Sequence, residues 1–356
     1  MLTHFIRIAI SYSVALLPLV ANPEWEALEK SSRWKALRAQ VNSRLSTNPK
    51  DGEALHWKAK VLMAFGKAEE SYMAAKESVK LSPQSAEAWA QLSASAGVMA
   101  NRASVLKKMS FGTECRDSGI KALGLDPKNR VALEVMANFY QHAPGVLGGD
   151  KKKAESHRIA LETIFPEIKT TNELREARRS RDKTRINSLL KKAMEQYPKA
   201  HWPFVNAAQN ALDRSTLNPQ MAQVYAKQAL ENDQFSARAW GYLAQAYAAE
   251  GKWTDFDATI TKAETILTDN AHPHYLAATW LISASKEPKK AEALLRRYLS
   301  MEPEAGAPGH AQARWRLALA LEQQGDKVNA LKELREAAKH LPKNTELSAD
   351  LKRLGG

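Results

Sequence analysis

Residues 237–268 read ARAWGYLAQAYAAEGKWTDFDATITKAETILT, and this stretch decides the fold. It divides at Gly251-Lys252 into two segments whose apolar residues recur every three or four positions, as in two amphipathic helices joined by a turn. Large and small residues stand at fixed places counted from Ala237. They are Trp240 at 4, Leu243 at 7, Ala244 at 8, Tyr247 at 11, Phe256 at 20, Ile260 at 24 and Ala263 at 27.

This spacing resembles the tetratricopeptide repeat, a helical hairpin of about 34 residues with a large residue at position 4 and small residues at positions 8 and 27. Such hairpins cannot bury their apolar faces alone, so neighbouring units must stack. The resemblance implies an all-α protein, a tetratricopeptide-like α-solenoid in which antiparallel helix pairs form a right-handed superhelix. A chain of this kind is expected to be a binding scaffold.

The same unit recurs along most of the chain, and the sequence divides into regions according to how closely each matches the repeat pattern. We expect an N-terminal repeat block with a capping helix over 22–168, a basic degenerate repeat or hinge over 169–198, and a C-terminal repeat block with a capping helix over 199–356. Two stretches exceed the usual period. Residues 101–113 predict longer helices or a projecting turn, and residues 143–150, with one Pro and three Gly, predict a loop without helix.

The N-terminal segment has a basic start, an apolar run over 8–21 and a small residue, Ala21, before Asn22-Pro23. This order is typical of a secretory signal peptide, so we expect residues 1–21 to be removed by cleavage after Ala21. The run is short for a transmembrane helix, which needs about 20 apolar residues. Retention as an inner-membrane anchor is the alternative to an exported, periplasmic protein.

Composition supports helix and indicates an affinity for anions. The chain is 44% hydrophobic and 7% aromatic, and its 52 Lys and Arg exceed its 39 Asp and Glu, giving a net charge of +13. This charge favours acidic partners or anionic surfaces, unless it forms a solvated outer face. The single cysteine, Cys115, excludes an intramolecular disulfide, and its repeat position predicts burial.

In a superhelix of this type the first helix of each pair lines the concave face. Residues on those helices that packing does not use are therefore candidate partner contacts, because amide side chains suit the backbone of an extended peptide. The candidates are Gln91, Asn138, Gln141, Asn206, Gln209, Arg238 and Gln245. For any one of them, simple solvation is the alternative interpretation.

A second candidate surface lies in the degenerate repeat, where residues 169–192 contain nine Lys or Arg and three Asp or Glu. We expect this segment to contact an acidic partner or an anionic surface. The basic patch comprises Arg175, Arg178, Arg179, Arg181, Lys183 and Arg185.

Residues 102–154 carry a more specific resemblance. A Phe-Tyr at 139–140, an Ala-Pro at 143–144 and a Gly-Gly at 148–149 precede a Lys-Ala at 153–154, after a repeat with basic residues near its turn. This pattern is similar to a group of exported bacterial tetratricopeptide proteins. The similarity implies a bacterial envelope protein and no transferable activity.

No catalytic or metal motif stands out. The sequence from Gly148 to Lys152 precedes a helix and could hold an anion, yet it lacks the Gly-Lys-Ser/Thr ending of a phosphate-binding loop. His272 and His274 have no third ligand in view. We therefore expect no enzyme, no metal, no cofactor and no small-molecule substrate; an enzyme using the Gly-Gly loop is the least favoured reading.

The sequence thus predicts a non-enzymatic interaction scaffold of the bacterial envelope that binds a peptide or protein on its concave face. The alternative is a protein that binds polyanions or anionic membrane surfaces through its basic segments. Salt-sensitive binding would separate the second from the first. Nucleic acid is disfavoured if the chain is exported.

Overall fold

The computed structural model describes residues 22–355, and the segment expected to be a signal peptide lies outside this range. Within it the chain forms nineteen α-helices, one 3-10 turn and no strand. The N-terminal half contains α1 (Pro23–Lys30), α2 (Trp34–Thr47), α3 (Gly52–Ala64), α4 (Ala68–Leu81), α5 (Ala86–Arg102), α6 (Val105–Leu125), α7 (Arg130–His142), η1 (Gly145–Leu147) and α8 (Lys151–Ile164).

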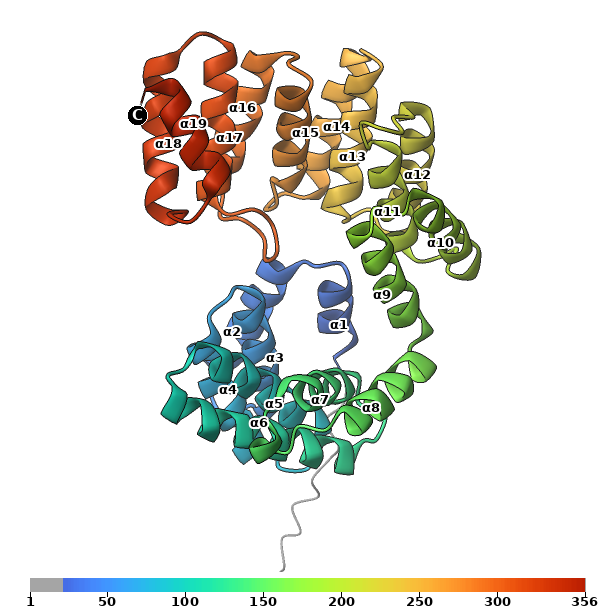
Figure 1. Ribbon diagram of the computed structural model, residues 1–356, viewed down its shortest axis with the longest axis vertical. Coiled ribbons are helices and arrows are strands. Elements are labelled where there is room, and N and C mark those ends of the chain that lie inside the picture. The colour runs from blue at the N-terminus through green and yellow to red at the C-terminus, as the bar shows by residue number, and fades with distance from the viewer. Residues whose placement is uncertain (1–21, 356) are drawn as a thin grey trace, which may run out of the picture.

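The chain continues through a basic helix pair, α9 (Pro166–Arg179) and α10 (Lys183–Gln196). The C-terminal half contains α11 (His201–Ala211), α12 (Pro219–Asn232), α13 (Ala237–Ala249), α14 (Trp253–Ile266), α15 (His272–Ser283), α16 (Pro288–Leu299), α17 (His310–Gln323), α18 (Lys327–His340) and α19 (Thr345–Leu354). Figure 1 shows these helices following one another as stacked antiparallel pairs. The all-α solenoid predicted from the repeats is confirmed.

Local chemistry sets the ends of the helices. The Asp51 carboxylate accepts a hydrogen bond from the backbone N–H of Ala54 (2.9 Å), and Asn129 caps Ala132 in the same way (3.0 Å). Such caps satisfy backbone donors that a helix leaves unpaired at its start. The turn inside the α13–α14 pair uses Gly251 at φ +72°, a left-handed conformation that glycine adopts without a Cβ clash.

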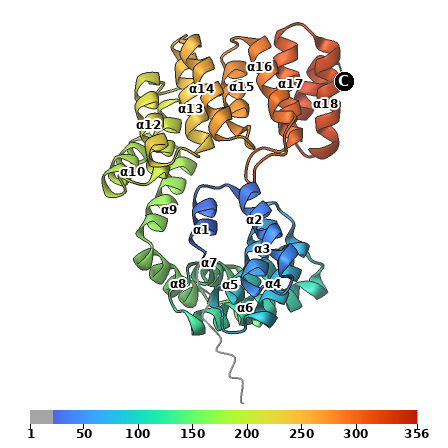
Figure 2. The same cartoon turned by 180° about the vertical axis from the view of Figure 1, so that it is seen from behind.

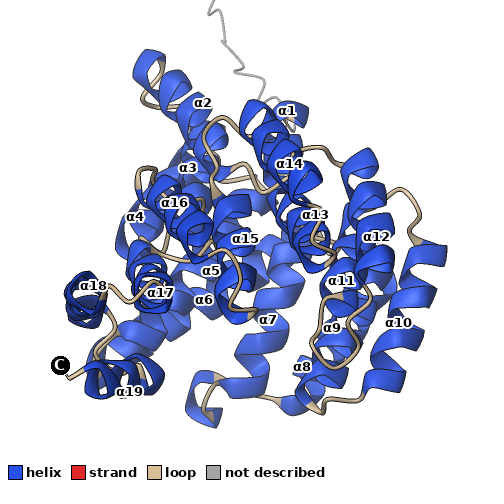
Figure 3. Ribbon diagram, turned by 90° about the horizontal axis from the view of Figure 1, so that it is seen from above, coloured by secondary structure: helices blue, strands red, loops and turns tan. Residues whose placement is uncertain are grey.

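The spacing of the quoted repeat places its residues as expected. Trp240, Phe256 and Ala263 are buried, and Ala244 is fully enclosed. The small residues allow first helices of successive pairs to touch, so α13 packs on α11 and α15, and α15 packs on α17. Seen from above, α11, α13, α15 and α17 lie along the inner side of the C-terminal arc, and α12, α14, α16 and α18 along its outer side (Figure 3).

The two irregular stretches have structural explanations. The extra residues near 101–113 lengthen α5 and α6, which have 17 and 21 residues. The loop at 143–150 contains no α-helix, only the short turn η1, and Leu147 from this turn is buried. Cys115 is buried as predicted; the Ser93 hydroxyl donates to its carbonyl oxygen (2.6 Å), and burial raises the pKa of the thiol.

The array curves so far that its two halves meet. Figures 1 and 2 show the chain path as a ring, with the loop between α16 and α17 against the turn between α1 and α2. An ion pair joins Arg38 to Glu302 (2.5 Å), the backbone N–H of Lys35 donates to the Glu304 carboxylate (3.1 Å), and Arg33 lies over the Phe235 ring (4.1 Å). We call this interface the ring contact.

Candidate functional site

The inner layer of first helices is interrupted at α9. Helices α5 and α7 pack on each other, as do α11 and α13, whereas α9 packs mainly against α8 and α10. The sequence explains this break, because α9 buries only Thr170, Leu174 and Ala177 among its 14 residues. With so little apolar surface, α9 stands apart from the first helices on either side. A pocket lies on each of its flanks.

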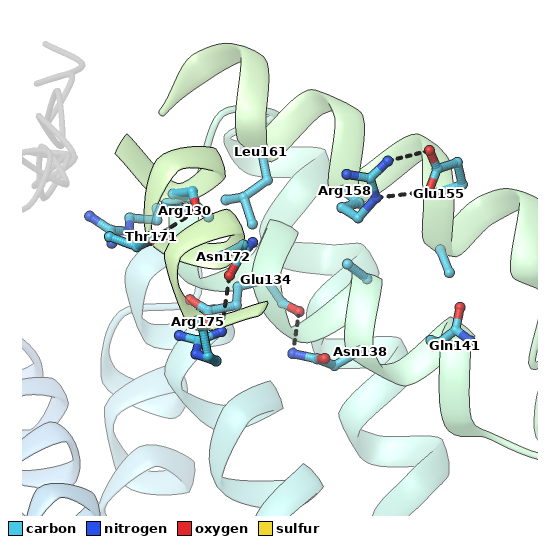
Figure 4. A pocket seen from close by; sticks show the side chains of 13 residues that line it. Arg130, Glu134, Asn138, Gln141, Glu155, Arg158, Leu161, Thr171, Asn172 and Arg175 are labelled. Atoms are coloured by element: carbon cyan, nitrogen blue, oxygen red, sulfur yellow. Dashed lines mark hydrogen bonds and ion pairs between the residues drawn. The ribbon is translucent and has the colours of Figure 1, made fainter. Parts of the chain in front are cut away.

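The first of these, the α7–α9 pocket, has a volume of about 320 Å³. Asn138 and Gln141 come from α7, Arg158 from α8 and Arg175 from α9 (Figure 4). The remaining residues that line it are Arg130, Glu134, Ala137, Ala154, Glu155, Leu161, Ile168, Thr171 and Asn172. It therefore joins an apolar floor to amides and guanidinium groups, a combination that suits a peptide segment.

Several polar groups in the α7–α9 pocket have internal partners. The Arg158 guanidinium pairs with Glu155 (2.5 Å) and Glu162 (2.9 Å), so its charge is neutralised within α8. Arg175 donates to the Asn172 side-chain oxygen (3.0 Å), a neutral acceptor that leaves its positive charge uncompensated (Figure 4). Gln141 is exposed. Arg175 and Gln141 are thus the groups best placed to meet a ligand here.

The second, the α9–α11 pocket, has a volume of about 430 Å³ on the other flank of α9. Arg178, Arg181 and Lys183 supply three positive charges, and Asp213 is the one carboxylate among the residues that line it. The others are Ile186, Asn187, Gln209, Asn210, Ser215 and Thr216. Hydrogen bonds from Ser215 lower the pKa of Asp213, so this carboxylate stays ionised and partly satisfied near neutral pH.

Arg178 is the unusual residue of the α9–α11 pocket. It is half-buried, and across residues 22–355 its guanidinium has neither a hydrogen-bond acceptor nor a carboxylate partner. Burial lowers the pKa of Arg178, and the nearby positive charge of Arg238 lowers it further. Arg238 itself donates to the Gln209 side-chain oxygen (2.9 Å) and to the Tyr242 hydroxyl (3.2 Å). The positive charge of Arg178 is therefore opposed by a second cation and balanced by no carboxylate among the described residues.

The structure sorts the residues predicted as partner contacts. Asn138 and Gln141 line the α7–α9 pocket, Gln209 lines the α9–α11 pocket, and Asn206 and Arg238 line a further pocket beside the ring contact. Gln91 and Gln245 are buried instead. The Gln91 amide donates to Ser95 (3.2 Å) and the Gln245 amide to the Leu276 carbonyl (2.7 Å), so both amides are engaged within the repeat packing.

The basic patch divides in a similar way. Arg175 faces one pocket, while Arg178, Arg181 and Lys183 line the other. Arg179 is exposed and lines neither pocket. Arg185 is exposed and forms an ion pair with Glu176 (3.3 Å).

Sequence reasoning missed the residues that complete these pockets and the ring contact. Arg130 and Asn172 carry no repeat signature, and Lys35 and Glu304 meet across the whole array. A signal was present for Arg178, because it follows Leu174 by four positions and so shares the buried side of α9.

The Gly-Gly loop is already satisfied. The Asp150 carboxylate accepts hydrogen bonds from the backbone N–H groups of Lys152 (2.8 Å) and Lys153 (3.2 Å) at the start of α8. The amides that an anion would use are thus occupied by a residue of the same loop.

His272 and His274 do not converge on a shared ligand. His274 contacts the Glu264 carboxylate (3.0 Å), and burial lowers the pKa of both imidazoles. Across residues 22–355 no three His, Cys, Asp or Glu side chains form a group that could hold a metal ion. In that same part of the chain, no helix has the length and apolar character needed to cross a membrane.

Comparison with known proteins identifies the repeat. Stacked helical hairpins with an inner layer of first helices define an α-solenoid. Residues 283–345, which include α16 to α18, match the family model described as tetratricopeptide repeat. Over these residues the chain carries tetratricopeptide repeat sequence, and the other described helix pairs share the same hairpin architecture. No curated protein matches the chain.

Solved structures similar to this chain include yeast Tom70, with 12% sequence identity and a TM-score of 0.47, over 93% of this chain and 86% of that chain. The Cut9 and Hcn1 assembly of APC/C is 16% identical with a TM-score of 0.43 and covers 94% of this chain; the match spans 55% of that chain, about half its length. MamA is 20% identical with a TM-score of 0.33, over 50% of this chain and 92% of that chain.

These identities and TM-scores are low, so the assignment of the fold depends on the helix pairs of this chain and on the family match. Tetratricopeptide repeat proteins are in general non-catalytic scaffolds for protein–protein interaction.

Proposed function

We propose that this protein is a non-enzymatic scaffold of the bacterial envelope that binds a peptide or protein partner along its inner face. The observation that carries the proposal is the break in the inner layer at α9, which opens a polar pocket on each side of one helix. Elsewhere neighbouring first helices pack on each other, and α13, which contacts both α11 and α15, buries nine of its 13 residues.

The two pockets offer what an extended chain needs. The Asn138 amide donates to the Glu134 carbonyl (3.1 Å) and keeps its side-chain oxygen for a peptide N–H. Gln209 accepts from Arg238 (2.9 Å) and keeps its NH₂ group for a peptide carbonyl. Apolar residues such as Leu161 and Ile186 receive the side chains of the peptide. Binding along a preformed, rigid surface also loses little conformational entropy in the receptor. Placement in the envelope is supported by the basic start and apolar run of residues 1–21, which are read from the sequence alone.

A photo-cross-linking amino acid tests the proposal. It is introduced in the full chain in native host cells at Asn138 and Gln209, with Lys191 on α10 as the exposed control outside both pockets. We expect protein adducts from the two pocket positions that survive a high-salt wash and are absent at Lys191. Equal adducts from all three positions, or none from the pockets, would refute a dedicated inner binding face.

Cell fractionation in the same strain tests the location. The proposal expects the mature chain and its adducts in the periplasmic fraction. Recovery of the chain in the cytoplasm would refute the envelope assignment without touching the scaffold role. Adducts that consist only of anionic lipid and vanish in salt would instead favour the alternative function, binding of an anionic surface through the basic patch.

A further inference from the structure

The α9–α11 pocket combines an excess of positive charge with one half-buried cation that has no partner among the described residues. Three basic side chains line it against one carboxylate, and Asp213 already accepts hydrogen bonds from Ser215. Lys183 donates to the Ser215 hydroxyl (2.6 Å), so the lysine and the aspartate share one neutral bridge. The positive charges of Arg178 and Arg181 have no partner among the described residues.

The half-burial of Arg178 is costly in the free protein. A guanidinium removed from water needs a carboxylate or other acceptors to compensate its lost hydration, and Arg178 has none among the described residues. The neighbouring Arg238 adds repulsion. Such an arrangement becomes favourable when an oxyanion enters, because the anion pairs with Arg178 and screens the two arginines from each other.

We infer that the α9–α11 pocket is an oxyanion site that receives an acidic side chain of the partner peptide. This inference rests on the proposed scaffold function and names the chemistry of the partner. Arg178 and Arg181 supply planar donors that suit a carboxylate or phosphate group. The Asn210 amide donates to Asn187 Oδ1 (2.9 Å), and this contact leaves the NH₂ group of Asn187 as a further donor in the pocket.

The geometry also distinguishes this site from general attraction by a basic surface. Arg178 and Arg179 are adjacent, carry the same charge and belong to the same helix, yet only Arg178 lines the pocket. A diffuse electrostatic effect depends on the charge and treats the two alike, whereas a built site depends on Arg178 alone.

Fluorescence anisotropy with the full mature chain tests the inference. The probe is an end-blocked, labelled oligoglutamate peptide, with oligoglutamine of equal length as the control, in about 150 mM salt to screen long-range attraction. We expect oligoglutamate alone to bind. Loss of a charge-assisted contact in R178Q should weaken that binding by about ten-fold or more, and R179Q by less than about two-fold. R178K should fall between, since lysine keeps the charge and loses the planar fork.

Inorganic phosphate identifies the source of the oxyanion. If phosphate displaces oligoglutamate from the wild type but does not displace the residual oligoglutamate bound to R178Q, the pocket binds the oxyanion group itself. If oligoglutamate fails to bind while phosphate raises the melting temperature of the wild type and not of R178Q, the pocket takes a free anion, and the peptide part of the inference is wrong.

Equal weakening in R178Q and R179Q, or no binding of either probe, overturns the inference. The scaffold role is judged separately. Salt-resistant adducts from Asn138 and Gln209 that persist in R178Q would leave the proposed function standing while the oxyanion site falls. If the wild type forms no adducts at Asn138 and Gln209, the scaffold role is refuted, whether or not oligoglutamate or phosphate binds.

Discussion

The pairs α13–α14 and α9–α10 have the same hairpin architecture but differ in how many side chains of their first helix are buried. Helix α13 buries nine of its 13 residues, including Trp240, while α9 and α10 bury three each of 14. The contrast lies in the first helices, because α14 buries four of its 14 residues, about as many as α10. Helix α9 keeps its inward positions for Arg175 and Arg178, which line pockets. One repeat geometry can therefore serve either stability or recognition, according to which residues face the inner layer.

The largest effect on stability is expected when Trp240 is removed from α13, in the α13–α14 pair. Its ring is buried in the cluster formed by α11 to α14, and its indole N–H donates to the Gln234 carbonyl (2.8 Å). We expect W240A to lower the free energy of unfolding by about 3–5 kcal/mol, because the removed ring leaves a cavity. Urea denaturation of R179A, in the basic pair, should stay within about 0.5 kcal/mol of the wild type. Similar losses in both variants would remove the contrast between the two pairs.

An added methyl group on Gly241 tests how tightly α13 packs against α15. A Cβ added to Gly241 would lie 2.6 Å from Cδ1 and 2.8 Å from Cβ of Leu276. We expect G241A to destabilise the fold by about 1–3 kcal/mol through overpacking. The matched control is G124A in α6, where a Cβ meets nothing within 4 Å and should stabilise by about 0.4–1 kcal/mol. Thermal denaturation that shows a gain for both would mean that α13 and α15 pack loosely.

Lowering the pH should destabilise the fold around His56 on α3 and have less effect on the basic pair α9–α10. His56 on α3 is buried with an unpartnered Nδ1, and burial lowers its pKa to about 3, below the usual value of 6.5. The unfolded chain therefore binds the proton first, so His56 stabilises the fold fully above pH 6.5 and progressively less as the pH falls toward 3. We expect a loss of about 1.4 kcal/mol per pH unit below pH 6.

The H56Q variant, neutral at every pH, should lose the part of the slope due to His56 in urea titrations between pH 6.5 and 4.5, and keep the smaller part due to His272, whose pKa is lowered to about 4. The basic pair α9–α10 contains no histidine, so hydrogen exchange there should change less over the same range. An unchanged slope in H56Q would place the acid sensitivity elsewhere.

The smallest effect on stability is expected at the ring contact. The Arg38–Glu302 pair is partly exposed, and such pairs contribute about 0.2–1 kcal/mol. R38E would set two carboxylates against each other. We expect a larger radius of gyration by small-angle X-ray scattering with little change in melting temperature, and no expansion in R335E, the same charge change at an exposed position on α18. Equal radii for R38E and the wild type would show that the ring does not depend on this pair.

The sequence predicts the packed part of the molecule well, because packing obeys a local period. The places of Trp240, Ala244 and Phe256 follow from the repeat alone, since each contacts residues one helix away. The ring contact could not be predicted in this way. It brings Lys35 to Glu304 only after the small rotations between successive pairs have accumulated along the array.

The candidate site lies between these extremes. Gln91 and Gln245 read as free amides in the sequence, yet each finds an internal acceptor that is fixed by the depth of helix packing. Arg178 and Arg179 differ by one position, and only the helical phase relative to Leu174 separates them. Composition predicts a basic segment but does not reveal which of its charges is half-buried.

The most direct test measures two quantities in R178Q, the affinity for oligoglutamate and the free energy of unfolding. If the basic pair serves recognition, the affinity falls by about ten-fold or more while stability is unchanged within about 0.5 kcal/mol or rises, because an unpaired half-buried charge has been removed. Unchanged affinity, or a loss of stability as large as that of W240A, would contradict the account.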